Sequence, residues 1–206
     1  MTIATYDDLK DKFTESTLNW MARTFSDDEA DEFIDLAEAD FNMSLRCREM
    51  EAVTDLSPTS NVYTLPTDYL EYKRVVEKAS IRRRLDFITE DAVDALYPTR
   101  ESGLSCNFTI IGGSLYTYPL SSNDVELTYY QKVPALSDST TTNWLLTRLP
   151  NLYLHAAMYY AAEYIGDTEK MAAELAFVER YKGMLMSLDN RAKFASAGIT
   201  LAGPVW

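Results

Sequence analysis

His155 is the only histidine among the 206 residues, so a nucleophilic triad or a histidine acid–base pair would have to use it. Leu154 and Ala156 flank it within Leu152 to Ile165, a stretch that is apolar on almost every side of a helix. A histidine in such surroundings is usually a hydrogen-bonded core or interface residue. We therefore predict a structural role for His155.

Eight carboxylates and no basic residue lie between Asp27 and Asp40. Clustered carboxylates can hold two metal ions in nucleases, which leaves a metal-dependent hydrolase open as an alternative. The acids alternate with the apolar residues of a predicted helix, however, so most of them should point to solvent instead of converging on an ion. The acids that we expect on this exposed face are Asp27, Asp28, Asp31, Asp35 and Glu38.

Cys47 and Cys106 are the only cysteines, and neither belongs to a CxxC or Cys/His pattern. We expect both to be small buried residues and predict neither a disulfide framework nor a zinc site. Gly112-Gly113 lies between two predicted strands, which indicates a hairpin turn and not a phosphate loop. The sequence therefore predicts no catalytic residue, no metal site and no cofactor, and a protein that is not an enzyme.

Arg82, Arg83 and Arg84 form the most concentrated basic feature, with three more basic residues shortly before it. Because side chains alternate along a strand, Arg83 should face opposite to its two neighbours. The region has no motif of interleaved basic and aromatic residues that would indicate a DNA-binding patch. We expect the three arginines to pair with an acidic surface of a neighbouring subunit.

The chain carries 19 basic and 32 acidic side chains, which gives a formal net charge of −13. Such a charge opposes general binding to nucleic acid or anionic membranes, so DNA should pass the protein without sequence-specific binding. The longest apolar run, Ala156 to Ala162, is far below the ~20 residues needed to cross a membrane. Met1 to Asp8 lacks the regions of a secretion signal, so we expect a soluble chain in a cytosol-like compartment with no membrane partner.

The elements that position these residues follow the order helices, strands, helices, which predicts an α+β fold. Thr5 with Asp8, and Ser26 with Glu29, have the spacing of capping boxes, so two amino-terminal helices should begin there. The second helix should continue to about Arg46.

From Met50 onward, short apolar runs are separated by turn residues, which predicts an antiparallel β region. The predicted strands are 51–56, 62–65, 69–76, 81–88, 108–111, 115–118 and 125–133. The first two should form a hairpin across 57–60, and the last three should form a meander whose first turn is Gly112-Gly113. Thr89 should cap a short helix that ends before Pro98.

Helices return near Asn143 and again at Pro150, whose fixed φ suits a first helical position. We expect the apolar helix that follows to be the spine of a bundle, and Gly166 to end it. A last helix from Thr168 should carry an apolar face, with Glu174 among the charged residues off that face. The predicted organisation is 1–49, amino-terminal helices; 50–134, a β-rich insertion with one short helix; 135–197, carboxy-terminal helices; and 198–206, a tail.

The tail from Gly198 to Trp206 is apolar and has no charged side chain. Disordered tails are rarely built in this way, so we expect it to dock on a partner. The alternative is that it folds back on the helices of its own chain. Burial of each large side chain would contribute ~1.5 to 3 kcal/mol against an ordering cost of ~1 to 2 kcal/mol per residue, so many copies are needed for a durable joint. The expected contact residues are Ile199, Leu201, Pro204, Val205 and Trp206.

Five segments carry a family resemblance, in order along most of the chain. They are Leu65–Glu71, Thr109–Leu115, Leu127–Ser137, Asn143–Leu146 and Pro150–Leu154. Each is a strand, a turn or a helix start, and together they resemble the head-to-tail adaptor proteins of short-tailed and related phages.

The resemblance implies a bundle of amino- and carboxy-terminal helices with an inserted antiparallel β region, assembled as a homo-oligomeric ring, typically twelvefold, beneath the portal. It implies a structural virion protein that is assembled in the host cytoplasm, with the portal protein and a tail or nozzle protein as partners. Such rings extend the DNA channel and dock the tail, so the resemblance implies that the acidic face of 27–40 lies near the channel or a neighbouring subunit. A stopper or tail-completion protein of the same connector is the nearer alternative, and the metal-dependent hydrolase is the more distant one.

Overall fold

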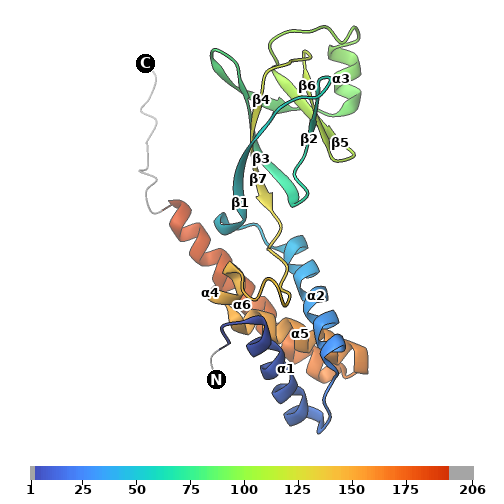
Figure 1. Cartoon of the computed structure of the whole chain (residues 1–206), viewed down its shortest axis with the longest axis vertical. Helices are drawn as coiled ribbons and strands as arrows, with labels where there is room; N and C mark the ends of the chain where they lie inside the picture. The colour runs from blue at the N-terminus through green and yellow to red at the C-terminus, as the bar shows by residue number, and fades with distance from the viewer. Residues whose placement is uncertain (1–2, 195–206) are drawn as a thin grey trace, which may run out of the picture. The chain divides into compact units, whose positions relative to one another are not determined.

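The computed structural model describes residues 3–194 and divides the chain into two compact units. The helical unit combines Met1–Glu49 with Val133–Trp206, and the sheet unit is Met50–Lys132. Figure 1 traces the chain through the amino-terminal helices, the sheet unit and the carboxy-terminal helices in that order. The predicted α+β class, with an inserted β region, is confirmed.

Two capped helices open the helical unit, α1 (Tyr6–Met21) and α2 (Asp27–Ser44). In α1, the Thr5 hydroxyl accepts a hydrogen bond from the Asp8 N–H, and the Asp8 carboxylate accepts one from the Thr5 N–H. Ser26 and Glu29 form the same two hydrogen bonds at the start of α2. Both predicted capping boxes, at Thr5 and at Ser26, are therefore confirmed. They satisfy backbone donors that the first turn of a helix cannot satisfy itself.

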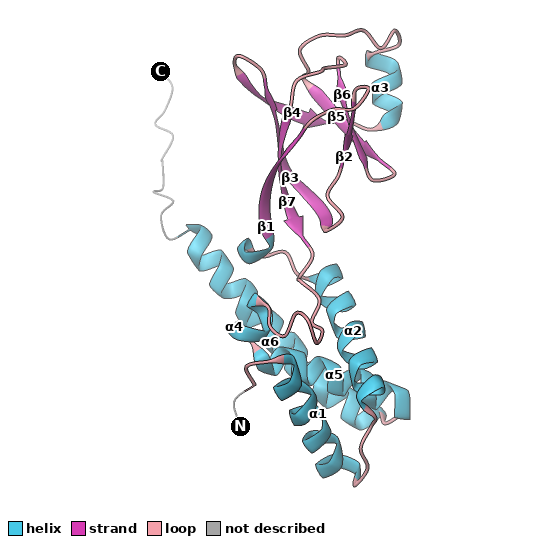
Figure 2. Ribbon diagram, in the orientation of Figure 1, coloured by secondary structure: helices cyan, strands magenta, loops and turns pink. Residues whose placement is uncertain are grey.

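Three further helices complete this unit: α4 (Trp144–Arg148), α5 (Pro150–Ile165) and α6 (Thr168–Phe194). Pro150 occupies the first turn of α5, and Gly166 ends the helix with a left-handed φ of 82°, which glycine adopts without steric cost. Helix α5 packs against α1, α2, α4 and α6, which confirms its prediction as the spine. Figure 2 shows these helices in cyan.

The sheet unit holds seven strands and one short helix, α3 (Glu90–Leu96), which Thr89 caps as predicted. A 3₁₀ turn, η1 (Arg48–Met50), precedes the strands. They are β1 (Glu51–Leu56), β2 (Val62–Thr64), β3 (Tyr69–Lys78), β4 (Arg82–Phe87), β5 (Asn107–Ile111), β6 (Ser114–Tyr118) and β7 (Val125–Gln131). Their order in the sheet is β1-β7-β3-β4-β5-β6-β2.

Two neighbouring pairs of strands form hairpins. Strands β3 and β4 pair antiparallel, and so do β5 and β6. Gly112 and Gly113 join β5 to β6 with φ values of 56° and 80°, the pair of positive angles that a two-residue hairpin turn requires. Strands β4 and β5 pair parallel, so the sheet is mixed and mostly antiparallel.

Two predicted strand pairings are wrong. Strand β1 pairs with β7 and β2 pairs with β6, so β1 and β2 form no hairpin with each other. Strand β7 pairs with β1 and β3 instead of continuing a meander from β6. The physical reason is a shared core, because the sheet curls and brings side chains from both edge strands into one cluster.

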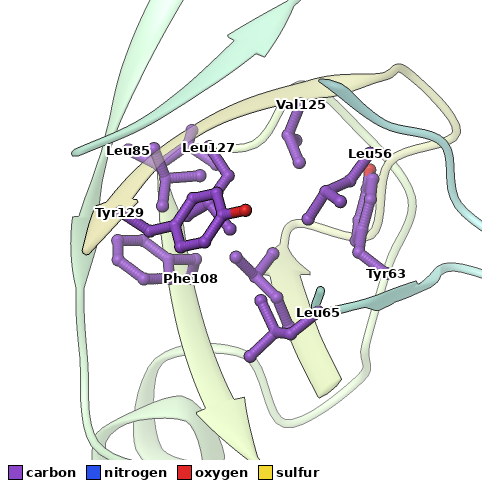
Figure 3. Packing of buried hydrophobic residues seen from close by; sticks show 10 residues of the cluster. Leu56, Tyr63, Leu65, Leu85, Phe108, Val125, Leu127 and Tyr129 are labelled. Atoms are coloured by element: carbon purple, nitrogen blue, oxygen red, sulfur yellow. The ribbon is translucent and has the colours of Figure 1, made fainter. Parts of the chain in front are cut away.

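Figure 3 shows this core of the sheet unit. Leu56 from edge strand β1 and Tyr63 from edge strand β2 belong to the same buried cluster as Leu85 from β4. Other labelled members of the cluster are Leu65, Phe108, Val125, Leu127 and Tyr129. Pairing between β1 and β2 would satisfy the local turn, but the observed curl buries apolar side chains from every strand.

Candidate functional surfaces

The outer face of α2 carries exposed acids next to exposed apolar residues. Asp27, Asp28 and Asp35 are exposed as predicted, and none forms an ion pair with any residue from 3 to 194. Further along the same helix Leu36 is exposed, and Met43 leaves 82% of its surface exposed. Unpaired charge beside exposed apolar area is more typical of a contact surface than of a solvated helix face.

Asp31 and Asp40 on the same helix are held by contacts within the chain. Asp31 accepts a hydrogen bond from the Tyr6 hydroxyl at 2.7 Å and lies 3.3 Å from the Lys10 ammonium. Burial and this hydrogen bond raise the pKa of Tyr6 well above its usual range. Asp40 accepts from Lys182 of α6 at 2.7 Å. Asp31 is therefore only partly available to the surface on which it was predicted.

Glu38 does not belong to the exposed acidic face, which corrects its prediction. It is buried, and its Oε1 accepts from the Leu136 N–H at 2.9 Å and from the Tyr153 hydroxyl at 3.1 Å. Burial raises the pKa of Glu38 to about 7, against the opposing effect of the two hydrogen bonds. The signal was in the spacing, because Glu38 follows Ile34 by four residues and so shares its buried side of the helix.

The three arginines of β4 reach different partners. Arg82 lies 2.6 Å from Glu126 of β7, while Arg83 approaches the Cys106 sulfur at 3.2 Å. Arg84 is exposed and forms no ion pair within residues 3–194. The thiol of Cys106 is exposed, so the prediction that both cysteines are buried is wrong for Cys106 and confirmed for Cys47. Cys106 follows a loop and not a core strand, which explains its exposure.

Charges on the outer face of the sheet are largely paired with each other. Lys73 reaches Glu51 at 2.5 Å, and Lys78 reaches Asp55 at 2.7 Å. Arg74 shares Glu126 with Arg82, at 3.2 Å. Four of the six cations of the basic patch therefore have an acid within their own sheet, whereas Arg83 and Arg84 form no ion pair within residues 3–194.

His155 lies on α5, hydrogen-bonded to a carboxylate of α6. Its Nδ1 is 2.6 Å from Glu174, and its ring stacks on Phe177 with 4.5 Å between centroids. Glu174 is buried, contrary to its prediction as a residue off the apolar face of α6. Burial acts to raise the pKa of Glu174, but hydrogen bonds from His155 and Lys170 hold it below its ordinary value. The pair joins two helices, a structural role.

Glu77 of β3 is a further buried carboxylate, and its strand pattern did not reveal it. Its Oε1 accepts from the Ser121 hydroxyl at 2.6 Å, the Asn123 amide at 3.1 Å and the Ser105 N–H at 3.4 Å. These donors belong to the loops before β5 and after β6. Glu77 therefore ties both loops to the centre of the sheet unit.

Three further sequence predictions concern the tail, metal binding and membrane-spanning helices. The tail residues Ile199, Leu201, Pro204, Val205 and Trp206 lie outside the described residues. Within 3–194, no three His, Cys, Asp or Glu side chains gather closely enough to hold a metal ion. No helix in that range is both long and apolar enough to span a membrane.

Comparison with known proteins gives one family. A family model described as SU10 adaptor protein matches residues 4–201, which covers both units of the chain. No curated protein matches the chain.

Proposed function

The chain belongs to the SU10 adaptor protein family, a phage head-tail adaptor family, and we propose that it forms a ring that joins the portal of the head to the tail. Family membership makes it a structural component of the virion that binds other virion proteins. The ring of twelve copies, the portal, and the tail or nozzle protein are the finer parts of the proposal.

The observation that carries this proposal is the extent of the family match. It spans residues 4–201, so it includes the helices, the whole sheet unit and the beginning of the apolar tail. A match confined to one helix pair would support only a shared fold element. Here the match covers both helical segments and the β insertion together, so membership of the family, and not the fold alone, supports the adaptor role.

Charge supports a channel that DNA crosses without binding. The net charge of −13 repels a polyanion at short range, and a ring of copies would multiply this effect around the bore. The paired sheet face offers few free cations to phosphate groups. Genome passage during packaging and ejection is the function that such a surface would serve.

The tail is proposed to attach the ring to the portal through Ile199, Leu201, Pro204, Val205 and Trp206. It follows α6 in the chain after residues 195–197, and its side chains are uncharged. Each copy would contribute a weak apolar contact, and many copies held in one ring would bind together with far higher avidity.

Deletion of residues 199–206 tests the proposal. The shortened chain should keep its melting temperature, because the cores of both units lie in earlier residues. It should no longer join portal-bearing heads that lack their own adaptor, as measured by co-sedimentation with the heads. A variant in which Gly and Ser replace the same residues controls for tail length and should also fail. Attachment at the wild-type level by both variants would contradict the assignment of the tail.

A further inference from the structure

The carboxy-terminal half of α6 bears a groove whose apolar residues stand between two arginines. The groove has a volume of about 450 Å³, and its lining residues are Arg180, Gly183, Met184, Ser187, Leu188 and Arg191. Met184 and Leu188 remain 46% and 45% exposed. Neither arginine forms an ion pair with a residue in the described range, although the chain has 32 acidic side chains.

Gly183 lies in the interior of this helix and has a negative φ, so backbone conformation does not require a glycine there. A Cβ at this position would meet no atom within 4 Å, which means that the chain itself does not need the space. Glycine in a helix interior lowers helix stability, but it lets another backbone approach closely. Its presence beside the apolar groove indicates a close neighbour.

The outer face of α2 has matching chemistry. Asp35, Ala39 and Met43 are all exposed and lie four residues apart, so they form one row along the helix. On α6, Arg180, Met184 and Leu188 form a row with the same spacing. Each row begins with a charge and ends, about 12 Å further along, with a large apolar side chain.

We propose that the α6 groove of one copy binds the α2 outer face of a second copy, an inference that rests on the proposed ring. With the two helices parallel, Arg180 meets Asp35, Met184 packs over the small Ala39, and Leu188 contacts Met43. Opposite charges at one end fix the register, and apolar burial at the other supplies attraction.

The two surfaces differ, so the contact is head-to-tail. A contact of this kind leaves an unused groove on one copy and an unused α2 face on the other, and further copies add until the rotation closes a ring. Within one chain the two surfaces do not cover each other, since Met184, Leu188, Leu36 and Met43 are all exposed.

Two charge-reversed chains test this contact. The groove variant carries Arg180→Glu, and the face variant carries Asp35→Lys. Each alone should self-associate at least tenfold more weakly than the wild type in sedimentation velocity, because like charges then meet. An equimolar mixture should recover wild-type assembly, because alternating copies give every contact an opposite-charged pair.

Gly183→Ala is the second probe, and Lys132→Glu, at an exposed position of the sheet unit, is the charge-reversal control. The alanine should raise the melting temperature and weaken self-association, opposite directions that a purely structural glycine would not produce. Lys132→Glu should leave association unchanged. If the wild type assembles only on portal-bearing heads, the same variants are compared there by counting the copies bound to each head.

A mixture that fails to recover assembly in solution and on heads overturns the proposal. So does a wild type that never self-associates in either setting, or a pair of reversed chains that associate normally but lose the heads, since the groove would then bind another protein. The proposed function fails separately: a chain that assembles through these surfaces but never joins heads would keep this contact and lose the adaptor role.

Discussion

The outer face of the sheet and the outer faces of α2 and α6 differ in how their charges are paired. On the sheet, Lys73 pairs with Glu51 and Lys78 pairs with Asp55 across the intervening strand β7. On the helical unit, Asp35 and Arg180 are exposed and form no ion pair within 3–194. Charges that are already paired within the chain contribute little to binding a partner. Unpaired charges beside exposed apolar residues can form new ion pairs at an interface.

This difference teaches where assembly chemistry resides. The sheet unit has one buried cluster and pairs several of its surface charges with each other, although Val53, Ile81 and Leu96 are exposed. The helical unit leaves Met43, Met184 and Leu188 exposed and carries the apolar tail at its end. We infer that changes in the sheet unit alter stability more than assembly, and that changes on the helical surfaces do the reverse.

The largest expected effect on stability comes from Glu77→Ala in the sheet unit. Loss of the carboxylate leaves buried donors of Ser105, Ser121 and Asn123 without their acceptor. The free energy of unfolding should fall by about 3 to 5 kcal/mol, as when one partner of a buried charged network is removed. Urea unfolding followed by tyrosine fluorescence measures this loss.

Glu77→Gln is the matched control, because its amide oxygen keeps an acceptor in place, and it should cost about half as much. Any folded fraction of either variant should assemble like the wild type. Folded protein that cannot assemble would break the contrast between the two units.

Next in size is the effect of Glu38 on the pH dependence of the helical unit. Its pKa rises from 4.5 to about 7 on folding, so the folded chain binds the proton more tightly than the unfolded chain. This contribution to stability is complete below about pH 4.5 and is lost as the pH rises to about 7. It amounts to roughly 2 to 3 kcal/mol.

Glu38→Gln keeps an acceptor for Leu136 and Tyr153 but cannot ionise. Relative to the wild type, it should therefore gain roughly 2 to 3 kcal/mol of stability between pH 5 and pH 8. Thermal unfolding at both pH values measures the gain, with Asp28→Asn on the exposed side of α2 as the control. If the stability difference between the Gln variant and the wild type stayed constant with pH, folding would not raise the pKa of Glu38.

The smallest effect should come from the exposed pair Lys78 and Asp55, 2.7 Å apart. Lys78→Ala should change the free energy of unfolding by less than about 1 kcal/mol, because water and salt already screen such a pair. Assembly, measured by sedimentation, should not change. A loss of assembly here would place a contact on the sheet face and weaken the comparison.

Local signals in the sequence predicted the helical unit well. Thr5, Ser26 and Pro150 act within one helical turn, so the residues that specify each helix start lie beside it in the chain. The order of elements and the family resemblance were also correct.

Strand pairing could not be predicted in the same way. Strand β1 pairs with β7, with Glu51 opposite Tyr130, and a local turn at 57–60 carries no information about a partner so distant. The choice depends on how the whole sheet curls around its cluster, which no window of neighbouring residues contains.

The burial of the acidic residues was predictable in part. Glu38 and Glu174 occupy helical positions that face the core by spacing alone, and both were misread because acids are usually exposed. Glu77 gave no comparable signal, since its donors come from loops around 105 and 121–123. The exposed rows of α2 and α6 could be identified only from the structure, because the exposed fraction of each side chain distinguishes a free helix face from a packed one.

Electron cryomicroscopy of an assembled particle tests the central claim most directly. The account predicts a ring of this chain between portal and tail, with α6 of each copy against α2 of the next and the tail residues on the portal. A chain located elsewhere in the particle would contradict the adaptor assignment, and a ring joined through its sheet units would contradict the division of roles between the two units.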